Sequence, residues 1–163
     1  MRRYLLTAAA AVAAAIAANS ASAQESPTIL KGQCGPPSNF ATGSVDANLD
    51  EHSTPFHCNS AVITFPKYKR VLINFVLTGS KRANMIGFAG DAIEGGEVNV
   101  DHLYMNDGRT LNVTKGHCQT LWKPNGSIKS LICGARLERG DIAVATVIVF
   151  ETTPAVQHRG KRR

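Results

Sequence analysis

The stretch from residue 115 to residue 136 constrains the fold more than any other part of the chain. It consists of two extended runs, each with one cysteine (Cys118 and Cys133), on either side of the turn Pro-Asn-Gly at 124–126. Proline presets the backbone for the first turn position, and glycine adopts positive φ without steric cost. The pattern therefore predicts an antiparallel hairpin with a disulfide bond across it.

Two registers are open for this hairpin. A two-residue loop, Asn-Gly, pairs the two cysteines directly. A three-residue loop, Pro-Asn-Gly, offsets them unless a further irregularity near Gly116 or Gly134 restores the pairing. The missing N–H of Pro124 favours the longer loop, whereas the cysteines favour the shorter one.

Residues 1–23 have the composition of a secretory signal peptide. Arg2 and Arg3 precede an alanine-rich apolar run, and small residues at 21–23 form a cleavage site. The run is too short and too weakly apolar for a membrane span. We therefore expect cleavage near Ala23 and a periplasmic or secreted mature protein. The arginine pair leaves export by the twin-arginine route open beside the general secretory route.

The chain has four cysteines, and an exported chain with an even number of cysteines is expected to be disulfide-bonded. Of the three pairings that four cysteines allow, we predict Cys34–Cys58 and Cys118–Cys133. Each bond closes a loop of modest length and stabilises the fold by about 3 kcal/mol, because it lowers the entropy of the unfolded chain.

The positive net charge belongs to the ends of the chain. Of the 18 lysines and arginines, two lie in the signal peptide and four lie at 159–163, which leaves 12 against 12 acidic residues. The folded body is therefore neutral, and no specific nucleic-acid partner is predicted. Residues 152–163 are predicted to form a basic disordered tail, with a weak contact to an anionic surface as its expected role.

Short strands separated by turns fill the rest of the chain, and no helical periodicity of useful length appears. Residues 57–151 contain about eight such strands in hairpin order. We therefore predict an all-β fold, a single antiparallel β-barrel or sandwich. Residues 24–56, which include Gly-Pro-Pro at 35–37, are expected to form an irregular N-terminal arm pinned by Cys34.

Five residues are candidates for contact with a ligand or partner: His102, Tyr104, Trp122, Asp107 and Arg109. Alternation along the strand expected at 97–105 places the first two on the same face as Val98 and Val100. The tryptophan is either a core ring or a platform for a ligand. The last two flank the tip of a hairpin, and ordered tips of this kind often carry recognition.

No catalytic, cofactor-binding or metal-binding residue is predicted. The pairs His57-Cys58 and His117-Cys118 are poorly placed to share one ion, because adjacent strand residues point to opposite faces. No nucleophile elbow occurs in the chain. The glycines at 87 and 90 lack the spacing and the following helix of a phosphate-binding loop.

These features indicate an exported, disulfide-bonded β domain that acts as a non-enzymatic binding or inhibitor-like module. The short exported chain with disulfides and an antiparallel sheet resembles, at the level of fold, the periplasmic inhibitors of proteases and lysozymes and the lipocalin-like carriers. A lipocalin-like carrier, with an interior near Tyr104, His102 and Trp122, is the alternative, and an envelope hydrolase is a further one. The expected partner is an envelope or extracellular protein, or a small apolar ligand.

Overall fold

The computed structural model describes residues 26–67, 69–79 and 84–153. The predicted signal peptide and most of the predicted basic tail lie outside these residues. The described chain is all-β, as predicted, and its strands form one antiparallel sheet.

The sheet has eleven strands, and two short 3-10 helical turns connect β2 to β3 and β6 to β7. The elements are, in chain order, β1 (Thr28–Cys34), β2 (Asn39–Ser44), η1 (Leu49–His52), β3 (Ser53–Pro55), β4 (Ser60–Lys67), β5 (Arg70–Leu77), β6 (Asn84–Ile93), η2 (Glu94–Gly96), β7 (Glu97–Met105), β8 (Thr110–Asn112), β9 (Lys115–Trp122), β10 (Ile128–Arg139) and β11 (Ile142–Thr152).

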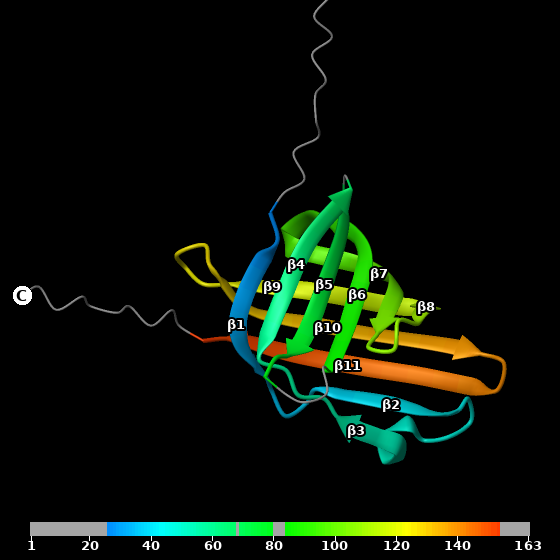
Figure 1. The fold of residues 1–163 in the computed structure, drawn as a ribbon. Helices are drawn as coiled ribbons and strands as arrows, with labels where there is room; N and C mark the ends of the chain where they lie inside the picture. The colour runs from blue at the N-terminus through cyan, green and yellow to red at the C-terminus, as the bar shows by residue number, and fades with distance from the viewer. Residues whose placement is uncertain (1–25, 68, 80–83, 154–163) are drawn as a thin grey trace, which may run out of the picture.

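Eight of these strands close into a ring, so the fold is a barrel. The ring runs β1-β4-β5-β6-β7-β9-β10-β11 and returns to β1. Strand β1 closes it with two different halves: Thr28 to Lys31 pair with β4, and Gly32 to Cys34 pair with β11. Figure 1 shows β4, β5 and β6 crossing steeply over β9, β10 and β11, as in a flattened barrel with two packed layers.

The expectation of an irregular arm over 24–56 is corrected for most of that segment. Its described part supplies β1, which closes the barrel, and β2 and β3, which extend the sheet from β11. The Gly-Pro-Pro at 35–37 ends β1 and does not prevent it, because the prolines follow the last residue that pairs with β11. The segment is pinned through Cys34, as expected.

Both predicted disulfides, Cys34–Cys58 and Cys118–Cys133, are present. In the second, the two cysteines are direct partners across β9 and β10. The longer loop is nevertheless present at the turn, where the Lys123 N–H donates to the Ser127 carbonyl. The register shifts between Ile128 and Ser130, next to the turn and not near either glycine considered above.

The core fills the space between the two layers. Phe75, Phe88 and Phe150 are fully buried at its centre. The ring of Phe75 lies 5.8 Å from that of Phe88, edge to face, and 5.9 Å from that of Phe150. Such pairs add to the free energy gained by burying the rings, because ring edges and faces carry opposite partial charges.

The prediction that His102 and Tyr104 lie on the same face of the strand as Val98 and Val100 is wrong. Opposite β6, the pairing steps from Ala89–His102 to Gly90–Val100, so Asp101 is the extra residue of a β-bulge. The bulge inverts the alternation, and Leu103 is buried in the core. His102 and Tyr104 therefore do not share the face of Val98 and Val100.

Gly32 allows β1 to change partners. A Cβ atom at this position would lie 2.1 Å from the Glu151 carbonyl oxygen and 2.6 Å from Cζ of Phe150. Backbone and a buried ring cannot both move away, so only glycine fits where β1 turns from β4 to β11.

We expect Gly32→Ala to destabilise the fold by about 3 kcal/mol, because the new methyl group overpacks the closing strand. Gly35→Ala is the matched control, since a Cβ there would have its nearest neighbour at 3.6 Å. Urea denaturation of both variants measures the difference. Equal stabilities for the two variants would contradict this role of Gly32.

Candidate functional site

The turns after β4, β6 and β9 gather at one end of the barrel, together with the start of β1 and the end of β11, because neighbouring strands run antiparallel. We call this the open end. Here the inward-facing side chains of seven strands surround a pocket of about 380 Å³. Its lining is almost wholly apolar and consists of Thr28, Ile63, Phe65, Val71, Ile73, Ala92, Ile93, Gly96, Glu97, Val98, Thr120, Trp122 and Ile128.

The floor and the rim of this pocket differ in exposure. Ile63, Val71 and Ile73 are buried in the floor, whereas Phe65, Ile93 and Trp122 are 38%, 50% and 53% exposed at the rim. Large apolar side chains half open to solvent around a concave apolar surface are typical of ligand sites.

Trp122 is fixed at the rim by η2. Gly96 has φ +82°, and a Cβ atom there would lie 3.0 Å from Nε1 of Trp122. The indole ring therefore packs directly on the backbone of the β6–β7 turn. Glu97 lines the pocket too, but its carboxylate lies 3.6 Å from Nε2 of His117, a residue on the outer face of β9.

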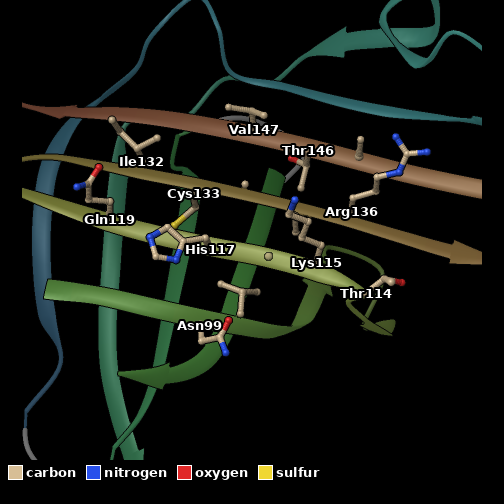
Figure 2. A pocket seen from close by; sticks show the side chains of 15 residues that line it. Asn99, Thr114, Lys115, His117, Gln119, Ile132, Cys133, Arg136, Thr146 and Val147 are labelled. Carbon is tan, nitrogen blue, oxygen red and sulfur yellow. The ribbon is translucent and has the colours of Figure 1, made fainter. Parts of the chain in front are cut away.

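A second concave surface lies on the outside of the barrel, over β7, β9, β10 and β11 (Figure 2). It is an open groove of about 840 Å³. Lys115, His117 and Arg136 contribute basic side chains, and Gly134 leaves part of its floor bare. The groove is larger than the pocket at the open end, but the pocket is the more apolar of the two and is closed by a buried floor.

A charged cluster lies where β5, β6 and β7 meet. Nη2 of Arg70 donates to Oδ1 of Asp101 at 2.6 Å, and Nδ1 of His102 lies 2.6 Å from the same oxygen. Asp91 is a looser partner of Arg70, at 3.6 Å. The hydrogen bond from Arg70, aided by His102, lowers the pKa of Asp101 to about 2. The bulge creates this cluster, because it turns Asp101 and His102 to one side.

The structure separates the five candidate contact residues. Trp122 lines the pocket at the open end, as a ligand platform would. His102 belongs to the charged cluster, and Tyr104 is paired with Gly87 of β6, so neither lines that pocket. Asp107 and Arg109 form an exposed hairpin tip, in which the Arg109 Nε donates to Oδ2 of Asp107 at 2.6 Å. A hydrogen bond from the Arg109 backbone lowers the pKa of Asp107.

Sequence reasoning missed Phe65 and Ile93 as rim residues. Both are apolar residues next to a turn, Phe65 in the inward phase of β4 and Ile93 at the end of β6. An apolar residue beside a turn at an open barrel end stays partly exposed, since no further strand residue covers it. That position is the sequence signal which could have identified them.

Fold and site together define a disulfide-bonded, closed antiparallel β domain with an apolar pocket at one end. Comparison of the chain with protein-family models, curated proteins and solved structures finds no match. Among the described residues, no group of three or more His, Cys, Asp or Glu side chains is arranged to hold a metal ion. The same part of the chain contains no helix that is long and apolar enough to cross a membrane.

The low pKa of Asp101 predicts a loss of stability in acid. Its folded-state pKa, about 2, is below the ordinary value of 3.8, so its contribution is complete above about pH 4 and is lost as the pH falls through about 2. Asp101 is half exposed, so solvent screening limits the effect to about 1 kcal/mol. Asp101→Asn should lack this loss, whereas Asp141→Asn, on an exposed turn, should retain it. Urea denaturation between about pH 5 and about pH 2 measures the slopes, and parallel curves for Asp101→Asn and wild type would contradict the prediction.

Proposed function

We propose that this chain is a non-enzymatic binding protein that holds a small apolar ligand in the pocket at the open end. The observation that carries the proposal is the pocket itself, with its volume of about 380 Å³, its buried aliphatic floor and its half-exposed aromatic rim. Volumes of this order suit small organic ligands, and burial of apolar ligand surface supplies the binding free energy.

The polar side chains that line the pocket favour a ligand whose inserted part is uncharged. Thr28, Thr120 and the Trp122 indole are its neutral polar side chains, and Glu97 is turned towards His117. A charged ligand group would lose its hydration there without gaining a counter-charge. The bound part of the ligand is therefore an aliphatic or aromatic group with few hydrogen-bonding atoms.

The two disulfides are of the kind that form in oxidising compartments outside the cytosol. We infer further that residues 1–23 direct export and that cleavage near Ala23 gives a periplasmic or secreted protein. A binding protein in such a compartment encounters apolar molecules in water, and an apolar pocket shields them from that water.

An inhibitor-like module is the second candidate. It is supported by the tip at Asp107 and Arg109, which is held by two hydrogen bonds between these residues and is therefore ordered before any partner arrives. A hydrolase would require a nucleophile within reach of His102, and among the described residues its side chain contacts Arg70 and Asp101 instead.

Fluorescence tests the pocket directly, because Trp122 is the only tryptophan in the chain. We expect neutral phenylnaphthylamine to bind and to take energy from Trp122. Ile93→Ser, at the rim, should weaken binding about tenfold, since it removes apolar contact area. Ile142→Ser is the matched control, as Ile142 is equally exposed but does not line the pocket.

Thr120→Phe, which fills the pocket from β9, should abolish binding while the fold is retained. Binding that is unchanged in Thr120→Phe, or weakened as much by Ile142→Ser as by Ile93→Ser, would contradict the proposed site.

A further inference from the structure

The groove on the outer face of β9, β10 and β11 contains a glycine that the fold does not require. Gly134 lies in the middle of β10, and it is absent from the residues with positive φ. A Cβ atom there would meet the Thr146 carbonyl oxygen at 3.8 Å and Cγ2 of Val147 at 4.0 Å, both ordinary van der Waals distances. The register shift of β10 is at the other end of its pairing, between Ile128 and Ser130.

A glycine inside a strand weakens the strand, because it packs no side chain and loses more backbone entropy on folding. It is explained by a bulge, by a sharp bend, or by a close approach of other atoms. The pairing of β10 with β9 and with β11 keeps one register from Ser130 to Arg136, which excludes a bulge at Gly134 and leaves no interruption in the ladders at which the strand could bend sharply. The third applies only if something outside the barrel wall comes close to its Cα.

A second unfavourable arrangement lies beside this glycine. Lys115 and Arg136 are direct partners across β9 and β10, and both side chains are exposed on the same outer face. Like charges in directly opposed positions destabilise a sheet. Arg136 has one partner, Oε1 of Glu138, at 2.9 Å from Nη2, and none of the described residues forms a salt bridge with Lys115.

The remaining lining has a consistent chemistry. His117 is the direct partner of Gly134 on β9, and Val147 is its partner on β11, so the two side chains flank the bare backbone (Figure 2). Asn99 and Gln119 add amide groups, and none of the residues that line the groove is acidic. Glu138 and Glu97 lie outside the lining, each beside one basic residue.

We propose that this groove binds a small organic anion. Its carboxylate or phosphate group lies between Lys115 and Arg136, and its body lies on Gly134 between His117 and Val147. The anion removes the repulsion between the two opposed cations, and the missing side chain provides the room for the body of the ligand. This site is on the outside of the barrel and is independent of the pocket at the open end.

Amide chemical shifts of the mature protein test the site with three probes of one shape: benzoate, phenyl phosphate and neutral benzamide. We expect the anions to shift the amide signals of Gly116, His117 and Gly134 and to bind at least about tenfold more tightly than benzamide. The tighter of the two anions tells whether the natural ligand carries a carboxylate or a phosphate. Equal affinity for all three probes, or no shift at Gly134, would overturn the proposal.

Two variants separate function from folding. Gly134→Ala should melt at the same or a higher temperature than wild type and should bind the anions about tenfold more weakly. Lys115→Gln should lose the preference for anions over benzamide, whereas Lys129→Gln, which removes an exposed cation elsewhere on β10, should keep it. Anion binding of wild-type strength in both Gly134→Ala and Lys115→Gln, or a lower melting temperature of Gly134→Ala with unchanged binding, would exclude the site.

Discussion

The closure of the barrel by β1 is the constraint on which the rest of the structure depends. The strand bonds to β4 with its first half and to β11 with its second, so it joins the two crossing layers at one corner. Without it, β4 and the second half of β11 would each present an unpaired edge, which is costly when buried and prone to association when exposed. Gly32 provides the bend, and the Cys34–Cys58 bond fixes the far end of the strand to the segment just before β4.

Closure also determines where the two concave surfaces lie. Inside the ring, the aromatic cluster of Phe75, Phe88 and Phe150 fills the centre, whereas the side chains at the open end leave part of the interior unfilled. The pocket there is the part of the interior that the core does not fill. Outside the ring, the surface of β9, β10 and β11 is concave around Gly134, which carries no side chain. One surface is apolar and enclosed and the other is polar and open, which suits them to different ligands.

Much of the fold could be predicted from local sequence, because hairpins and disulfides are local features. The turn at 124–126 and the spacing of the cysteines were sufficient for both bonds and for the central hairpin. The role of β1 could not be predicted, since β11, the partner with which it closes the barrel, lies at the other end of the chain, and most of the residues of β1 are polar or exposed. Closure is a non-local property, which no pattern within residues 24–56 encodes.

The site was less predictable than the fold for a related reason. A single bulge at Asp101 moved His102 and Tyr104 off the inner face, and bulges leave no clear mark in one sequence. Trp122 was recognised by its chemistry, whereas Phe65 and Ile93 became rim residues only when their strands met at the open end. Gly134 was considered only as a possible irregularity in the hairpin, because the room that a side chain would have beside it is visible only in the folded sheet.

Amide hydrogen exchange of the native protein tests the closure of the barrel most directly. The amides of β1 that bond to β4, and the Cys34 N–H that donates to the Cys58 carbonyl, should exchange only through global unfolding, at the same free energy as those of β10. A β1 that exchanges through a separate opening of lower free energy, while β10 stays protected, would contradict the account. It would mean that β1 is an attached arm and that the pocket has no permanent wall on that side.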